Sequence, residues 1–350
     1  MLDTFKSQIL AAGEANKPLC IRGAGSKDFY GNALQGEVLD TQAHAGIVAY
    51  EPTELFVTAK CGTPLVEIEA ALAEKGQCLA FEPPRFSADS TIGGVVAAGL
   101  SGPRRSSAGS LRDFVLGVKL LDGSARELSF GGQVMKNVAG YDVSRVIAGS
   151  LGTLGLITEV TLKVLPRPVA EATLRFELNQ TAALDKLNRW AGQPLPIVAS
   201  GWDAGVLTIR LAGARAAVES ALQKLGAGGT ADRDYWDGLR DQRLPFFATE
   251  TLWRLSVPST TPELTLPGEQ LIEWGGALRW LKSDAAPDTI RAAAAAAGGS
   301  ATLYRAPDEL KTQVGAFAPL PAALLQLHKN LKAAFDPQGI FNPGRLYKEF

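Results

Sequence analysis

The sequence contains few of the residues on which disulfides, metal centres and histidine-based catalysis depend. Only three of its 350 residues are cysteines and only two, His44 and His328, are histidines. An odd number of cysteines without a C-x-x-C pair argues against a disulfide framework, a zinc site and an iron–sulfur cluster belonging to this chain. The formal net charge of −1 gives no electrostatic case for binding nucleic acid or an anionic membrane surface.

Long apolar runs are also missing. No stretch approaches the ~18 residues that a membrane span requires, and the amino terminus lacks the basic-then-apolar pattern of a signal peptide. We therefore expect a cytoplasmic protein with no membrane span of its own. Its hydrophobic content of 46% is ample for sizeable cores.

The length and one proline-rich segment predict more than one domain. A single domain typically has ~100–200 residues, and this chain has 350. Pro166-Arg167-Pro168 marks a boundary at which the sequence pattern changes. We expect a first domain over residues 1–167, a second over 168–325, and a carboxyl-terminal segment over 326–350 that returns to the first.

In the first domain the sequence predicts helices and short strands before a hairpin. Thr63 is expected to cap the helix over 65–75, with Pro64 in its first turn and Gly76 at its end. Asp122-Gly123 predicts a hairpin. The other expected elements are a helix over 2–15, strands over 19–22, 38–40, 47–50 and 56–60, and hairpin strands over 115–121 and 125–130.

The second domain is expected to contain two strand–helix–strand sets in one sheet, an α+β arrangement. The alanine run over 292–297 is explained by helix propensity alone. The predicted strands cover 172–178, 197–202, 206–211, 251–257, 270–274, 277–281 and 301–305, and the predicted helices 182–190, 215–225 and the segment ending at 297. An amphipathic helix over 321–335 follows.

Four glycine-rich segments lie far apart in the sequence: 22–27, 90–102, 137–158 and 341–344. Glycine allows backbone angles that other residues avoid and lets a ligand approach the main chain. The presence of four such segments suggests that together they bind one extended ligand. Taken alone, the first segment fits an anion-binding nest or a plain turn equally well. It is neither a G-x-G-x-x-G fingerprint nor a Walker loop.

Taken together, these segments closely resemble the FAD-binding domain of the vanillyl-alcohol oxidase family, also called the p-cresol methylhydroxylase (PCMH) type. The similarity is to the branch with D-lactate dehydrogenases and bacterial glycolate oxidase. It covers about residues 1–165 and the last twenty or so. The matching motifs are Arg22-Gly23-Ala24-Gly25-Ser26, Thr91-Ile92-Gly93-Gly94, Lys136-Asn137-Val138-Ala139-Gly140-Tyr141-Asp142, Gly152-Thr153-Leu154-Gly155-Leu156-Ile157-Thr158 and Phe335-Asp336-Pro337-Gln338-Gly339-Ile340-Phe341-Asn342-Pro343-Gly344.

The resemblance implies an α+β fold: a two-subdomain FAD-binding domain of the PCMH type under a ferredoxin-like cap. It implies that the first loop holds the FAD diphosphate and that the later segments line the ribityl, flavin and adenine portions. The cofactor-binding residues expected on this basis are Arg22, Gly23, Ala24, Gly25, Ser26, Lys27, Thr91, Ile92, Gly93, Gly94, Gly99, Ser101, Gly102, Gly152, Thr153, Gly155, Ile157 and Asn342.

Departures from the family pattern concern the histidines. Relatives that bind flavin covalently commonly use His or Cys, but His44 and His328 lie outside the flavin motifs, so noncovalent FAD is expected. Related catalytic subunits carry the motif His-x-Gly-Asp-Gly-Asn-x-His in the cap, and this chain does not. We interpret His44 as a solvated loop residue and His328 as a helix-surface residue. No catalytic residue is assigned.

Other polar and aromatic residues allow two interpretations. Arg104 and Arg105 are either cations near the flavin edge or substrate carboxylate, or a solvated basic turn. Tyr141 and Asp142 are expected to shape the fold rather than to transfer protons. Four tryptophans of the second domain are interpreted as core or interface residues rather than a flavin stack: Trp236, Trp253, Trp274 and Trp280.

The glycolate oxidase branch implies a FAD-binding subunit of a heteromer with a D-type flavin subunit and an F-type iron–sulfur subunit. Such a complex would oxidise glycolate, with D-lactate as a second substrate, and pass electrons to a quinone or other acceptor. It would be cytoplasmic or peripheral at the inner membrane. Two alternatives are an autonomous FAD-dependent 2-hydroxy-acid dehydrogenase and a non-catalytic structural subunit. A UDP-N-acetylmuramate-type reductase shares the flavin fold, but the Asn342-Pro343-Gly344 ending argues against it.

Overall fold

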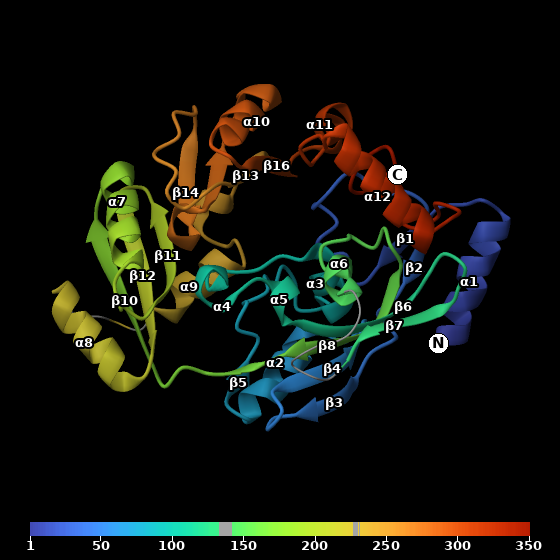
Figure 1. The fold of residues 1–350 in the computed structure, drawn as a ribbon, viewed down its shortest axis with the longest axis horizontal. Coiled ribbons are helices and arrows are strands. Elements are labelled where there is room, and N and C mark those ends of the chain that lie inside the picture. Colours follow the sequence, from blue (N-terminus) through green and yellow to red (C-terminus); the bar gives the residue numbers. More distant parts are fainter. Residues whose placement is uncertain (133–141, 227–229, 231) are drawn as a thin grey trace.

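The computed structural model describes residues 1–132, 142–226, 230 and 232–350. The chain forms two lobes, an amino-terminal lobe of short helices around an antiparallel sheet and a second lobe built on a larger sheet (Figure 1). The expected α+β class is confirmed.

The amino-terminal lobe contains a five-stranded antiparallel sheet in the order β3-β4-β8-β6-β7 and a separate parallel pair, β1 and β2. Its strands are β1 (Leu19–Arg22), β2 (Glu37–Asp40), β3 (Ile47–Glu51), β4 (Phe56–Lys60), β5 (Gln77–Cys78), β6 (Val115–Leu121), β7 (Glu127–Gly131), β8 (Leu156–Lys163) and β9 (Leu165–Pro166). Its helices are α1 (Leu2–Glu14), α2 (Leu65–Glu74), α3 (Ile92–Ala98), α4 (Arg105–Ala108), α5 (Leu111–Phe114) and α6 (Val143–Ile147).

Strand β8 is the centre of this sheet and is buried along most of its length. Leu156, Ile157, Val160 and Leu162 are all at most 5% exposed. Because side chains alternate along a strand, Leu156, Val160 and Leu162 share one apolar face, whereas Ile157 shares the other with Glu159 and Thr161. The main core of the lobe forms here, between the sheet and helices α2 and α3.

The second lobe is a seven-stranded antiparallel sheet in the order β10-β12-β11-β14-β15-β13-β16. The expected single sheet is confirmed. Its strands are β10 (Ala170–Glu177), β11 (Ile197–Asp203), β12 (Val206–Gly213), β13 (Leu252–Ser256), β14 (Glu269–Glu273), β15 (Leu278–Lys282) and β16 (Ser300–Arg305). Its helices are α7 (Gln180–Ala191), α8 (Arg215–Leu225), α9 (Arg233–Arg240), α10 (Pro287–Ala296) and α11 (Asp308–Val314), with short 3-10 turns η1 (Pro245–Phe247) and η2 (Trp274–Gly276).

The carboxyl-terminal segment returns to the first lobe. Helix α12 (Ala322–Phe335), red in Figure 1, lies on the same side of the molecule as α1 in blue. Beyond it, the Leu19 amide donates to the Ile340 carbonyl at 2.7 Å, and the Asn342 amide donates to the Leu19 carbonyl at 2.9 Å. Residues 340–342 therefore extend the β1–β2 pair, and Phe341 is fully buried beside α1.

Local expectations were mostly accurate. The Asp122-Gly123 hairpin is confirmed by the pairing of β6 with β7, and Gly76 ends α2 with φ +66°. The expected Thr63 cap is wrong, because Pro64 occupies the cap position. The Thr63 hydroxyl is instead used by a neighbouring loop, where it accepts from the Gly46 amide at 2.9 Å.

Candidate functional site

The first glycine-rich loop, residues 22–27, follows the carboxyl end of β1. Its main-chain amides point to a candidate ligand site because they lack protein acceptors among the described residues. In the described part of the chain, no protein acceptor takes the amide N–H groups of residues 23–27. Arg22 closes the loop on itself through Asp28, with an Nη2–Oδ2 distance of 2.6 Å. Gly25 has φ +71°, and a β-carbon there would overlap the Arg22 guanidinium. Successive free amides of this kind form an anion-binding nest.

The second segment, which leads into α3, lies directly against this loop. The Ser90 hydroxyl donates to the Ser26 hydroxyl at 3.0 Å. A β-carbon at Gly23 would overlap the Thr91 hydroxyl, and one at Gly93 would lie 2.6 Å from the Cys61 β-carbon. Glycine is required at position 23 because the two segments approach so closely, and at position 93 because α3 begins against Cys61, which follows β4.

The third segment packs along α3. The amides of Gly149 and Leu151 donate to the Val96 and Ala97 carbonyls at 3.0 and 2.8 Å. Gly99 has φ +67°, and a β-carbon on it would lie 2.8 Å from the Gly149 Cα. The Ser150 hydroxyl is buried and has no hydrogen-bond partner among the described atoms. An unpartnered buried hydroxyl is costly, and a bound ligand would satisfy it.

The fourth segment ties the others together through Asn342. Its side-chain oxygen accepts from the Ile21 amide at 2.7 Å, and its side-chain nitrogen donates to the Leu151 carbonyl at 2.7 Å. A β-carbon at Gly152 would lie 2.7 Å from the same nitrogen. The structure thus brings all four segments together. It gives Asn342 a positioning role, because both ends of its amide are already used by the main chain.

A buried ion pair supports this arrangement from α12. The Lys332 ammonium donates to Asp336 Oδ2 at 2.7 Å, to the Thr153 carbonyl at 2.8 Å and to the Phe341 carbonyl at 2.7 Å. Asp336 in turn accepts from the Phe341 and Ile340 amides. Burial lowers the pKa of Lys332, and the charge of Asp336 opposes that shift. The sequence analysis did not identify this pair, although the i, i+4 spacing was visible on the amphipathic helix.

The remaining predicted cofactor residues lie away from the nest. The Ser101 hydroxyl accepts from the Leu111 amide at 2.9 Å within the first lobe, and the Gly102 carbonyl accepts from the Trp274 indole of the second lobe at 3.0 Å. A β-carbon at Gly155 would lie 2.9 Å from the Leu121 carbonyl. Ile157 is a core residue of β8, so only its main chain is available to a ligand.

The third motif that carries the family resemblance lies largely outside the residues that the structure describes. Residues 136–141 of the motif over 136–142 are not among the described residues, and Tyr141 is one of them. Asp142 is described, and it caps α6 by accepting from the Arg145 amide at 3.4 Å and pairs with the Arg145 side chain at 2.9 Å. Asp142 therefore has the fold-shaping role that was expected.

An aromatic cluster joins the two lobes beside Ser101 and Gly102. Tyr30 and Leu151 of the first lobe are buried against Trp280 and Tyr304 of the second. The Trp280 and Tyr304 rings are 4.8 Å apart, and those of Tyr30 and Tyr304 are 5.2 Å apart. The expectation that the tryptophans are core residues is confirmed, since Trp236, Trp253, Trp274 and Trp280 are all at most 4% exposed.

This interface also buries a carboxyl group that the sequence analysis missed. Glu273 accepts from the Trp280 indole at 2.7 Å, and burial raises its pKa to about 7. It shares a cavity of about 20 Å³ with Ser101, Gly102, Arg254 and other residues. A carboxyl with a pKa near neutrality can exchange a proton, but a cavity of this size holds about one water molecule.

The two arginines of the 104–105 pair differ in exposure, since Arg104 is half-buried and Arg105 is exposed. Arg105 lies over the Trp274 ring at 4.6 Å, and Arg104 lines a separate cavity between the lobes. His44 is half-buried and contacts Phe5, with ring centroids 5.9 Å apart. Burial lowers the pKa of His44. His328 is a half-buried residue of α12 against Tyr347 and Phe350.

The described residues fit a dinucleotide that carries a diphosphate. The row of free amides suits diphosphate oxygens, as does the neighbouring Lys27, whose ammonium has no carboxylate within 4 Å in the described ranges. Burial lowers the pKa of Lys27 to about 8, and an adjacent anion would raise that pKa again by favouring the charged form. The unpartnered Ser150 hydroxyl belongs to a residue that lines a separate cavity of about 310 Å³ with Thr153, His328 and other residues.

The comparisons with known proteins identify the ligand class. A family model described as "FAD binding domain" matches residues 3–145, and one described as "FAD linked oxidases, C-terminal domain" matches residues 320–346. With the site geometry, these matches define a FAD-binding protein of the FAD-linked oxidase type. The predicted cofactor, FAD, is confirmed.

Curated relatives place the chain more narrowly. It is 50% identical to the glycolate oxidase subunit GlcE of Escherichia coli K12 over 343 residues, which cover 98% of this chain and 96% of that protein. The chain therefore belongs to the glycolate oxidase subunit GlcE family. It is also 31% identical over 176 residues to the glycolate oxidase subunit GlcD of Bacillus subtilis, but that match covers 37% of GlcD.

Solved structures confirm the fold class. A substrate-bound p-cresol methylhydroxylase has a TM-score of 0.72 at 14% identity, covering 99% of this chain and 87% of that one. An alkyldihydroxyacetonephosphate synthase has a TM-score of 0.66 at 16% identity, covering 97% and 73%. The PCMH-type domain with a cap is thus the fold of this chain. The individual cofactor contacts stay predictions. No helix in the described ranges is long and apolar enough to cross a membrane.

Proposed function

We propose that this chain is the noncovalent FAD-binding subunit of a heteromeric enzyme that oxidises glycolate. The observation that carries the proposal is the meeting of the four glycine-rich segments around the unused amides of residues 23–27. In this proposal the loop amides and Lys27 hold the diphosphate, Ser150 binds a polar group of the cofactor, and Asn342 holds the segments in register.

The proposal assigns residues 1–167 to the FAD-binding domain, 168–325 to the cap and 326–350 to the returning segment. The returning helix contributes Lys332, whose ammonium reaches the Thr153 carbonyl in the third glycine-rich segment. FAD supplies two-electron acceptance when bound. The protein's own residues supply its binding, its orientation and the exclusion of water by the aromatic cluster between the lobes.

We further propose that the chemical step belongs to a GlcD-type flavin subunit and that an iron–sulfur subunit takes the electrons. Support comes from the names of the relatives, which describe GlcE and GlcD as subunits of glycolate oxidase. The cavity beside Ser101 and Gly102 holds about one water molecule, which leaves little room for a hydroxy acid. The complex would lie in the cytoplasm or contact the inner membrane through a partner.

A second candidate is an autonomous 2-hydroxy-acid dehydrogenase. Oxidation of a hydroxy acid needs a base near the hydroxyl and a cation for the carboxylate. Glu273, with its pKa raised to about 7, and Arg254 line the same small cavity and would supply both. Movement of the cap would be required to admit a substrate.

One experiment separates these functions. The chain is purified alone, its flavin spectrum is recorded, and glycolate is added without oxygen. A yellow protein that does not bleach supports the proposal that this chain is a FAD-binding subunit. Reduction of the flavin by glycolate after a GlcD-type partner is added would support the proposed division between the two subunits. Bleaching that is lost in Glu273→Gln supports the autonomous enzyme instead. A colourless protein that takes up no added FAD contradicts both functions.

A further inference from the structure

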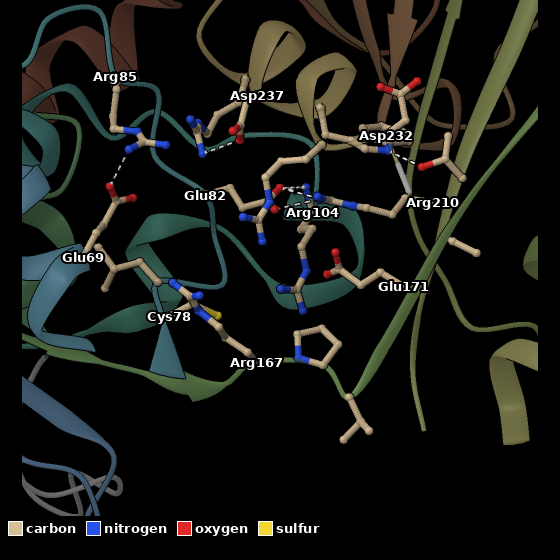
Figure 2. Close-up of a pocket in the computed structure, with 18 of the residues that line it drawn as sticks. Glu69, Cys78, Glu82, Arg85, Arg104, Arg167, Glu171, Arg210, Asp232 and Asp237 are labelled. Carbon is tan, nitrogen blue, oxygen red and sulfur yellow. Dashed lines mark hydrogen bonds and ion pairs between the residues drawn. The ribbon is translucent and has the colours of Figure 1, made fainter. Parts of the chain in front are cut away.

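A second, larger cavity opens between the two lobes, next to the end of the second glycine-rich segment at Gly102. Its volume is about 680 Å³, and none of the predicted cofactor residues lines it. Figure 2 shows its walls, which come from α2 and β5 of the first lobe, from the linker around Arg167 and from β12 and α9 of the cap. Its volume lies in the range of small-molecule sites.

Charged side chains dominate the lining, and several of them pair with one another. Arg85 pairs with Glu69 at 3.1 Å, and Arg240 pairs with Asp237 at 3.0 Å. One pair crosses between the lobes: Arg210 of β12 reaches both carboxylate oxygens of Glu82 at 2.7 Å. These residues neutralise one another and hold the walls in place.

The remaining lining arginines have no such partners. In the described part of the chain, no carboxylate lies within 4 Å of the guanidinium groups of Arg104, Arg167 or Arg233. Among the described residues, Glu171 is the one lining carboxylate without a cationic partner within 4 Å, since Asp232 pairs with Arg175. After pairing, the cavity keeps an excess of positive charge.

Arg104 is the deepest of these cations. Its Nε is buried and has no hydrogen-bond acceptor among the described atoms, and the same holds for Nε of Arg210. Unsatisfied buried donors are uncommon and call for an explanation such as a bound ion or water. Arginine at this depth is suited to carboxylate or phosphate, which it binds through two parallel hydrogen bonds.

We propose that this cavity binds a small organic oxyanion with two negative charges, a dicarboxylate or a phosphate monoester. Arg104 binds it at the floor, and Arg167 and Arg233 bind it at the rim. Because the three arginines belong to the first lobe, the linker and the cap, the bound anion ties the cap to the FAD-binding domain.

The test uses the full chain with FAD bound and isothermal titration at constant ionic strength. Inorganic phosphate is the probe in one arm and malonate in the other, with sodium chloride as the reference ion. Saturable binding is expected for at least one of the two probes. Binding of phosphate indicates a phosphate monoester as the ligand, and binding of malonate indicates a dicarboxylate. Arg104→Gln should weaken it roughly tenfold or more, the effect of losing a charge-assisted hydrogen bond. Arg215→Gln, an exposed arginine on α8, should change affinity less than twofold.

Two results would overturn the proposal. One is the absence of saturable binding of either probe, and the other is equal weakening in the Arg104 and Arg215 variants. FAD content and far-UV circular dichroism are recorded for each protein. If Arg104→Gln fails to fold, the exposed rim residue Arg233 replaces it in the Arg233→Gln variant, which must then weaken binding. Since FAD content is measured separately, the result is independent of the proposed flavin function.

Discussion

Replacing Lys332 by methionine should loosen the carboxyl-terminal segment from the flavin-binding loops. The ammonium holds Asp336, the Thr153 carbonyl and the Phe341 carbonyl, all within 2.8 Å. Both members of the ion pair are at most 5% exposed. Methionine keeps most of the side-chain length and flexibility but donates no hydrogen bond. The substitution therefore leaves two carbonyls and one carboxylate short of a donor.

The expected cost follows from the burial of Asp336. Removing one partner of a buried pair costs about 3–5 kcal/mol, because the other charge remains without compensation. Asp336 still accepts from the amides of Ile340 and Phe341, so we expect the lower end, about 3 kcal/mol. With about 2 °C per kcal/mol for a large domain, the Tm should fall by about 6 °C. FAD retention should fall as well, since Thr153 and Asn342 lose their support.

The assay is thermal unfolding followed by circular dichroism, with the flavin-to-protein absorbance ratio measured on the same samples. Lys329→Met on the same helix is the matched control, since Lys329 makes no hydrogen bond or ion pair among the described residues. The double variant Lys332→Met with Asp336→Asn should recover part of the loss, because the uncompensated charge is gone. A Tm within 2 °C of the unmodified protein and full FAD content would refute the reasoning.

Two further predictions test the nest and the interface. Gly94→Ala should be tolerated, since a β-carbon there meets only the Thr91 hydroxyl at 3.3 Å, whereas Gly94→Trp should abolish FAD retention by filling the proposed ligand path; equal FAD content in both variants would contradict this placement. Gly155→Trp is a poorer probe, because its β-carbon would already press on β6. Burial raises the pKa of Glu273 from 4.5 to about 7, so stability should fall as pH rises from 5 to 8, by on the order of 3 kcal/mol. Glu273→Gln should remove most of that fall in urea unfolding, and an unchanged pH dependence would count against the buried carboxyl.

Elements set by local patterns could be predicted from the sequence. Alternation and turn residues located the β6–β7 hairpin, and Gly76 located the end of α2. The four glycine-rich segments could be grouped from their number and from their resemblance to one family, and the approach of Gly23 to Thr91 gives a physical reason for glycine at position 23. Thr63 was wrongly predicted to cap α2. Its hydroxyl instead accepts a hydrogen bond from the amide of Gly46, 17 residues earlier in the chain.

The charged cavity could not be predicted in the same way. Arg104, Arg167 and Arg233 have no regular spacing, and although Arg104 was one candidate cation, nothing in the sequence links it to Arg167 or Arg233. Their proximity depends on how the cap packs against the first lobe, which the Arg210–Glu82 pair and the Trp274–Gly102 hydrogen bond determine. The pKa shift of Glu273 is likewise a result of burial between the lobes.

The packing between the two lobes also bears on which subunit of the proposed complex oxidises the hydroxy acid. A flavin enzyme that performs its own substrate oxidation needs space beside the flavin for substrate, base and cation. Here Trp280, Tyr304 and Tyr30 pack the junction tightly, and Glu273 lies in a cavity the size of one water. Because this packing leaves no room for a substrate beside Glu273, it supports the proposal that this chain holds FAD and transmits electrons. The oxidation of the hydroxy acid would then fall to a partner with a more open cap, and anaerobic mixing of the two subunits tests that assignment directly.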